Sequence, residues 1–122
     1  MARSQGLGLT SAEFQILLAL ADSERHGYEI MQVIARESRG ALALGPTTLY
    51  RSIRTLLQRG LIEESAQRPD PEHDDERRRY YRLTSGGWET AGTEVERLRR
   101  LVLVADSKSL TGPAWRRKVG ES

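Results

Sequence analysis

The sequence of 122 residues contains no cysteine. Disulfide bonds, zinc–thiolate sites and cysteine nucleophiles are therefore excluded. No apolar run approaches the length needed to cross a membrane. The N-terminal stretch MARSQGLGLTS lacks the apolar core of a signal peptide. We therefore expect a cytoplasmic protein with no membrane partner.

The sequence also lacks the patterns of common enzymes. It has only two histidines and no nucleophile-elbow, Walker or zinc-protease motif. Glu72, His73, Asp74 and Asp75 could be interpreted as metal ligands, but nothing fixes their geometry, so a solvated acidic loop is the better interpretation. We therefore expect no catalytic residue, no cofactor and no metal site.

Charge is nearly balanced, with 19 Lys and Arg against 17 Asp and Glu. The net charge of +2 is only weak support for nucleic-acid binding. Whether the protein binds nucleic acid must therefore be judged from where the charges lie in the sequence. The length predicts one domain with an added helix or tail.

The most informative stretch is Gly45 to Ser65. Pro46 suits a first helical turn, where a missing N–H costs nothing, and Gly60 ends the helix. One face of this helix is apolar, with Leu49, Ile53, Leu56 and Leu57. The other face carries hydroxyls and arginines, with Tyr50 at the boundary: Thr47, Thr48, Arg51, Arg54, Thr55 and Gln58. Such a face suits a groove of DNA, although an ordinary surface helix would also accommodate two arginines.

Two helices are expected before this one. Thr10 and Glu13 form a capping box for a helix that ends near Ala21. A second helix opens at His26, a turn or capping residue, and runs to about Arg36. Residues 41–44 alternate weakly and predict a very short strand. The apolar face expected for the first helix consists of Phe14, Leu17, Leu18 and Ala21.

A β-hairpin is expected after the Pro46 helix. Its strands are 61–65 and 80–83, with Tyr81 and Leu83 on one face. The long loop between them is acidic and then switches to three arginines, Arg77, Arg78 and Arg79. These lie where a hairpin arm would reach along a DNA backbone.

The last helix is expected from Thr84, its cap, to about Lys108. Apolar residues recur along it with heptad spacing. This seam could lie on the core of its own domain. Leu101, Leu103 and Val104 widen the apolar surface further, which favours a partner subunit and a homodimer. The seam, and so the expected dimer interface, consists of Trp88, Ala91, Val95, Leu98, Val102 and Ala105.

These elements predict a mainly α (α+β) fold, a winged helix-turn-helix with a two-stranded wing and a C-terminal dimerisation helix. We expect a flexible lead at 1–9, the winged helix-turn-helix at 10–84, the dimerisation helix at 85–108 and a basic tail at 109–122. The tail could be disordered, a phosphate clamp or a strap on the dimer.

With this arrangement the sequence resembles the PadR family of bacterial transcriptional regulators, in its small form with a single C-terminal helix. The matching motifs are HGYEI at 26–30, TLYRSIRTLLQRGLI at 48–62 and RRRYYRLTSGG at 77–87. The resemblance extends over about residues 9–105 and implies a homodimer on a palindromic operator in double-stranded DNA, usually a repressor. It also implies release by a small, often aromatic, effector near the dimer interface.

The resemblance implies the following DNA contacts. The recognition helix would be Pro46–Gln58, and the wing would carry its three arginines at its arm. Tyr28 would contact the DNA backbone. The acidic wing loop departs from the family and would repel phosphates unless it bends away. The recognition-helix residues facing DNA would be Thr47, Thr48, Tyr50, Arg51 and Arg54.

An effector pocket is expected between the last and first helices. Phe14 and Trp88 could line it and bind a hydrophobic or aromatic molecule, or they could simply fill the core. The last helix lacks the mid-helix aromatic residue on which some family members stack a planar effector. Two alternatives stay open, namely a regulator without any effector and a winged-helix protein–protein module that binds no operator.

Overall fold

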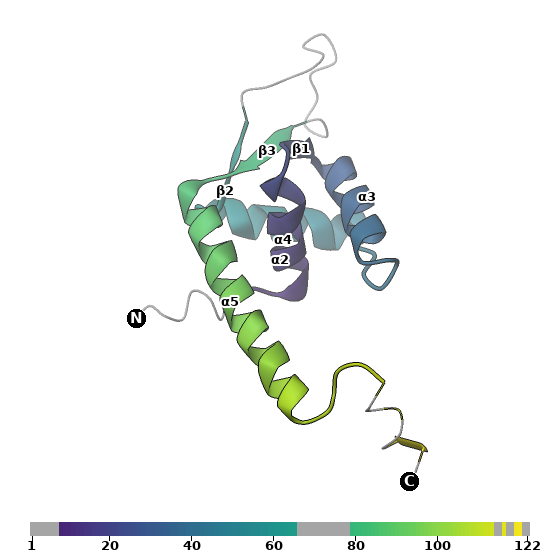
Figure 1. The fold of residues 1–122 in the computed structure, drawn as a ribbon. Helices are drawn as coiled ribbons and strands as arrows, with labels where there is room; N and C mark the ends of the chain where they lie inside the picture. The colour runs from purple at the N-terminus through teal and green to yellow at the C-terminus, as the bar shows by residue number, and fades with distance from the viewer. Residues whose placement is uncertain (1–7, 66–78, 114–115, 117–118, 121–122) are drawn as a thin grey trace.

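The computed structural model of the protein describes residues 8–65, 79–113, 116 and 119–120. Helix α2 is central and contacts α3, α4, α5 and β3 (Figure 1). The expected mainly α architecture with a small β-sheet is confirmed. In chain order the elements are α2 (Ser11–Ala21), β1 (Arg25–His26), α3 (Gly27–Glu37), α4 (Pro46–Gln58), β2 (Ile62–Glu64), β3 (Tyr80–Leu83) and α5 (Ser85–Ser107).

The capping box of α2 is confirmed. The Thr10 hydroxyl accepts from the Glu13 amide at 3.0 Å, and the Glu13 carboxylate accepts from the Thr10 amide at 2.9 Å. The expected apolar face is partly wrong, because Leu18 and Ala21 are exposed. Since nearly all of α2 is apolar, its pattern does not define one face, and its packing against other elements decides. The buried hydrophobic residues are Ile16, Leu17, Ala19 and Leu20.

His26 caps α3, as expected. Its Nδ1 accepts from the Glu29 amide at 3.3 Å, and the Glu29 carboxylate accepts from the His26 amide at 3.1 Å. Ile30, Val33 and Ile34 then pack into the core. These caps satisfy amides that the first helical turn leaves without intrahelical partners.

The sheet has the order β1-β3-β2, and both pairs are antiparallel. The hairpin of β2 and β3 is the expected wing, with Ile62 opposite Leu83. Tyr81 and Leu83 are buried, as the alternation predicted.

The expected strand at 41–44 is wrong, since these residues form no strand. Leu42 and Leu44 instead pack against the core, and the Leu42 amide donates to the Ser38 hydroxyl at 3.0 Å. The third strand is β1, which pairs with the edge of β3 that β2 leaves open. Strand identity here depends on which segment reaches that edge, not on alternation.

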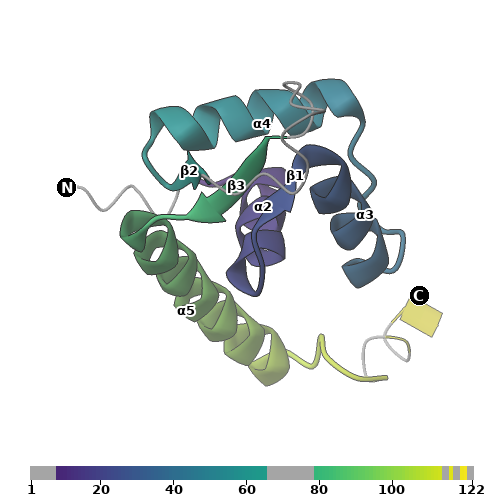
Figure 2. The same ribbon diagram turned by 90° about the horizontal axis from the view of Figure 1, so that it is seen from above.

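Helix α5 begins next to the end of α4 and diverges from the rest of the domain (Figures 1 and 2). Its first half packs on α2, with Ala91 against the core. Its second half is apolar and exposed at Leu101, Val102, Leu103 and Val104. No helix in the described ranges combines the length and the apolar character that a membrane crossing demands.

Candidate nucleic-acid interface

Helix α4 has one buried and one exposed face, and its bounds are those expected from the sequence. Leu49, Ile53 and Leu56 are at most 2% exposed, and Ser52 is buried beside them. Leu57, expected inside, is exposed at 37%. The opposite face presents hydroxyls and guanidinium groups to solvent from Thr47, Thr48, Arg51 and Arg54.

The start of α4 is also suited to an anion. Gly45 is its N-cap in an extended conformation, Pro46 opens the first turn, and no acidic residue lies in that turn. The N-terminal end of a helix carries a partial positive charge and free amides, which favours a phosphate there.

Arg51 and Arg54 are the two arginines on the exposed face of α4. In the described part of the chain neither forms an ion pair. Their guanidinium groups are therefore available to an external acceptor. Three other described arginines, Arg36, Arg39 and Arg100, also form no ion pair with a described residue. Six are each within 4 Å of a carboxylate, namely Arg25, Arg59, Arg79, Arg82, Arg97 and Arg99.

Tyr50 lies between α4 and α3. It is partly buried, and its ring lies against Gly27, the first residue of α3. A Cβ at Gly27 would be 2.6 Å from the Tyr50 hydroxyl oxygen and 2.9 Å from two ring carbons. Tyr50 therefore fixes how the two helices pack, a role that the sequence did not reveal. Its contact with DNA stays a prediction.

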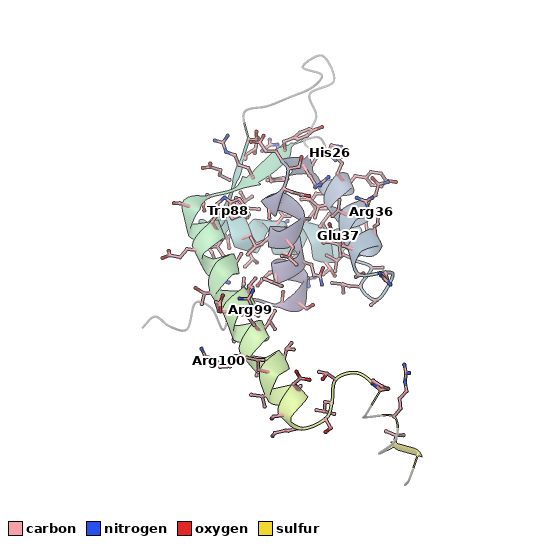
Figure 3. The ribbon with its side chains drawn as sticks, in the orientation of Figure 1. His26, Arg36, Glu37, Trp88, Arg99 and Arg100 are labelled. Atoms are coloured by element: carbon pink, nitrogen blue, oxygen red, sulfur yellow. The ribbon has the colours of Figure 1, made fainter. Side chains whose placement is uncertain are left out.

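The start of α3 also touches the base of the wing. Tyr28 is 58% exposed in the first turn of α3. The His26 ring packs edge-on against Tyr80 of β3, with centroids 5.2 Å apart and an interplanar angle of 87°. Figure 3 shows His26 beside the sheet at the start of α3. The backbone-contact role expected for Tyr28 requires this exposed position.

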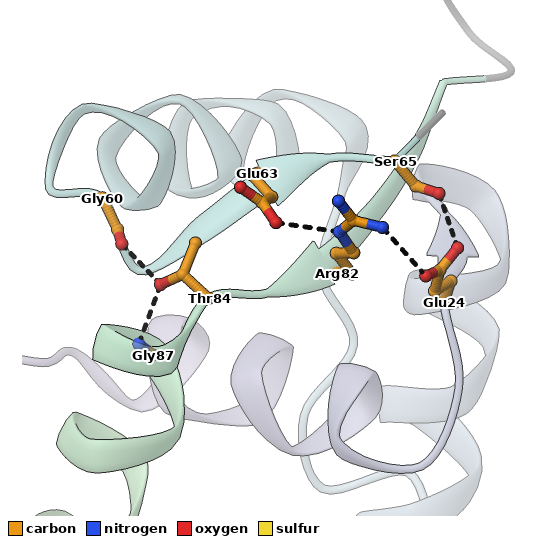
Figure 4. Close-up of polar contacts among 7 residues, drawn as sticks. All are labelled: Glu24, Gly60, Glu63, Ser65, Arg82, Thr84 and Gly87. Atoms are coloured by element: carbon orange, nitrogen blue, oxygen red, sulfur yellow. Dashed lines mark hydrogen bonds and ion pairs between the residues drawn. The ribbon is translucent and has the colours of Figure 1, made fainter. Parts of the chain in front are cut away.

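The strands of the wing are crosslinked by ion pairs. The Arg82 guanidinium lies 2.8 Å from Glu63 across the hairpin and 3.7 Å from Glu24 (Figure 4). The hydrogen bond that Arg82 donates to the Glu63 carboxylate raises the pKa of Arg82. Arg79 lies 3.0 Å from Glu64, so its expected phosphate contact would compete with that carboxylate. Arg77 and Arg78 lie outside the described residues.

The expected dimer-interface residues fall into two groups. Ala91, Val95, Leu98 and Ala105 are partly covered within the single chain. Trp88 and Val102 are each 55% exposed, and Trp88 lies near the start of α5 (Figure 3). Association through this seam stays a prediction, as does an effector pocket between Trp88 and the partly buried Phe14.

Glu94 is a buried residue that the sequence did not single out. Its exposed fraction is 4%, and its carboxylate accepts two hydrogen bonds from Arg97, at 2.8 and 2.5 Å. Arg97 lowers the pKa of Glu94. In the sequence a glutamate in a polar helix is expected at the surface, so the burial of Glu94 is visible only in the folded structure.

The described residues contain no cluster of His, Asp or Glu side chains that could hold a metal ion. The acidic stretch at 70–76, the one candidate that the sequence offered, lies outside the described residues. The basic end of the tail, at 117–118, lies outside them as well.

Several solved structures share this fold. A transcriptional regulator from Clostridium thermocellum is 24% identical with a TM-score of 0.66, over 81% of this chain and 96% of that one. A complex of RosR from H. salinarum is 25% identical with a TM-score of 0.63, over 89% and 97%. Bacillus subtilis PadR in complex with operator DNA is 19% identical with a TM-score of 0.60, over 70% of this chain and 47% of that one.

The family follows from a match to a family profile. A comparison with individual curated protein sequences finds no match. The profile described as "Transcriptional regulator PadR-like family" matches residues 16–92, which include α3, α4, both wing strands and the start of α5. This is more than half of the sequence, and the chain therefore belongs to the PadR-like family of transcriptional regulators.

Proposed function

We propose that the protein regulates transcription as a homodimer that binds a palindromic operator through α4. The observation that carries this proposal is the exposed face of α4, where Arg51 and Arg54, which form no ion pair with any described residue, accompany Thr47 and Thr48. Arginine can contact guanine edges with two hydrogen bonds, and threonine can contact bases or phosphates. A helix of this kind fits the major groove, with the first helical turn near the phosphates.

The wing and the start of α3 complete this surface. Tyr28 is exposed at the N-terminal turn of α3, where a phosphate would also meet free amides. The Arg77–Arg79 run would add backbone contacts that strengthen binding without choosing a sequence. Bacillus subtilis PadR, which shares the fold, was solved in complex with operator DNA.

The dimer is proposed on the exposed apolar surface of α5. Leu101, Val102, Leu103 and Val104 are 44–63% exposed and lie on all sides of the helix. Leu18 of α2 is a further exposed apolar side chain, at 39%. Large apolar side chains left exposed in this number support an association site. A two-fold dimer places two recognition helices on a palindrome.

We further propose repression that is relieved by a hydrophobic or aromatic effector. The effector would bind near Phe14 and Trp88, between α2 and α5 of the dimer. Trp88 is exposed in the single chain, so a ligand or a partner subunit can cover it. Such a ligand can release DNA only through a difference in its affinity for the bound and free arrangements.

Selection from a random DNA library, followed by fluorescence anisotropy, tests operator binding. We expect an enriched palindrome and a linear fall of log K with log salt concentration, with a slope of about −0.9 per phosphate contact. A winged-helix protein–protein module would enrich no sequence and show no salt-dependent binding. That result would refute the proposed function.

A further inference from the structure

Thr84 lies where the end of α4 meets the start of α5. Its hydroxyl donates to the Gly60 carbonyl oxygen at 2.6 Å and accepts from the Gly87 amide at 3.0 Å (Figure 4). Its own amide donates to the Leu61 carbonyl oxygen at 3.1 Å. One side chain therefore links the residue that ends the recognition helix to the first turn of the last helix.

The α4 side of this joint has a fixed geometry. Gly60 has a positive φ of 74°, and its amide donates to the Leu57 carbonyl at 3.0 Å. The next amide, that of Leu61, donates to the Leu56 carbonyl at 3.0 Å. This pair of bonds closes the helix end in a Schellman arrangement. The carbonyl of Gly60 therefore points in a direction set by the axis of α4.

The first turn of α5 packs tightly against the backbone that follows α4. A Cβ placed on Gly87 would lie 2.0 Å from the Leu61 carbonyl oxygen, so no residue with a side chain fits there without a shift of the backbone. The first turn of α5 consequently rests on the backbone of Leu61. No flexible side chain separates the two segments at this point.

We propose that Thr84 sets the angle between α4 and α5 and thereby the half-site spacing that the dimer accepts. This inference rests on the proposed function, because it needs a dimer, held by α5, that reads two half-sites. Helix α4 has 13 residues and is about 20 Å long at 1.5 Å per residue. A change of about 10° at the joint would move its far end by about 3.4 Å, one base step of a DNA strand.

Two variants of Thr84 separate its contact with Gly60 from its role as a cap. Thr84→Val removes both hydrogen bonds of the hydroxyl. Thr84→Asp keeps the cap, because the carboxylate accepts from the Gly87 amide, but it has no proton to donate to Gly60. Thr84→Ser keeps both bonds. Thr10→Val is the control for a lost helix N-cap, because the Thr10 hydroxyl also accepts from the amide three residues later but, within the described residues, donates to no carbonyl at the end of α4.

The experiment measures binding to the selected palindrome and to versions with one base pair added or removed at its centre. The affinity of each protein for a single half-site serves as reference. We expect wild type, Thr84→Ser and Thr10→Val to share one sharp preference for the parental spacing. Thr84→Asp and Thr84→Val both lose the hydrogen bond to Gly60. In both, the ratio of the affinity for the parental spacing to that for the altered spacings should fall by about three- to tenfold, the range produced by losing one hydrogen bond.

A parental spacing preference in Thr84→Asp would overturn the inference and leave Thr84 as a cap only. If Thr84→Val fails to fold, Thr84→Asp still decides, because its cap is intact. An equal loss of preference in Thr10→Val would also overturn it, since helix stability alone would then explain the effect. Failure of the proposed function is a separate result, in which the wild type itself binds no DNA or remains a monomer.

Discussion

At the scale of single residues, Gly27 is required by the ring of Tyr50. Gly27→Ala would place a methyl group 2.6 Å from the Tyr50 hydroxyl oxygen, and we expect a loss of about 1–3 kcal/mol in the free energy of unfolding, as for other overpacked sites. Tyr50→Ala should partly rescue that variant, because it removes the clashing ring. Urea denaturation of the two single variants and the double variant measures the coupling.

The control for this cycle is Gly92→Ala. Gly92 lies in α5 with open space at its Cβ position, so alanine should stabilise the protein by about 0.5–1 kcal/mol through helix propensity. Strict additivity of Gly27→Ala and Tyr50→Ala would contradict the proposed packing of Tyr50.

Replacing Arg97 should destabilise the protein more than replacing Glu94, its partner in the ion pair. Arg97→Met leaves a buried carboxylate without its partner, so we expect a loss of about 1–3 kcal/mol at pH 7. Glu94→Gln should cost less, because its amide oxygen keeps one of the two hydrogen bonds from Arg97 and no buried charge is left unpaired. Chemical denaturation at several pH values measures both. Arg99→Met, in an exposed pair with Glu96, is the control and should change stability by less than about 0.5 kcal/mol.

The sign of the pH dependence follows from the pKa of Glu94, which Arg97 lowers below its ordinary value. The pair therefore contributes stability at pH values above the ordinary glutamate pKa of about 4.3. That contribution is lost as the pH falls through the lowered pKa of the folded state. The difference between wild type and Arg97→Met should accordingly shrink in acid, and a constant difference down to pH 3 would contradict the assignment.

At the scale of elements, local signals in the sequence predicted helix ends well. The capping residues Thr10, His26 and Thr84 act within three positions of their partners, so their motifs are visible in the sequence. Strand β1 was missed because two residues form a strand only where they meet the edge of β3. Glu94 was missed for the same kind of reason, since its burial depends on a distant segment of the chain.

We predict that the exposed face of α4 distinguishes the operator from other DNA. Arg51→Ala and Arg54→Ala should each leave the fold intact, because both side chains are exposed, and weaken discrimination of the operator. A lost bidentate base contact costs about 1–3 kcal/mol. Anisotropy with operator and scrambled DNA measures that discrimination. Arg100→Ala, on the exposed part of α5, is the control and should bind like wild type (Figure 3). Parental discrimination in both α4 variants would show that another element reads the bases.

At the scale of the whole molecule, the apolar end of α5 is the surface on which the proposed dimer would form. The core of the domain, from Ile16 to Leu83, is closed without residues 101–104, because α5 has by then diverged from it (Figure 2). These four residues therefore add little to the stability of a monomer, and their exposure is best explained by association. The sequence indicated this surface through Leu101, Leu103 and Val104, which widen the apolar surface beyond the heptad seam, whereas its separation from the domain core required the structure.

Val102→Asp tests this surface without disturbing the domain. Val102 is 55% exposed in the single chain, so its replacement should leave the monomer folded. Full burial of a valine side chain between subunits contributes about 1.5–3 kcal/mol, and a buried aspartate would add the penalty of an unpaired charge. Light scattering should show the mass of two chains for wild type and of one chain for Val102→Asp. Thr93→Asp, exposed and off the seam, should stay dimeric. Operator affinity should fall together with dimerisation, because two half-sites then bind independently. A wild-type mass of one chain would remove the basis for a palindromic operator.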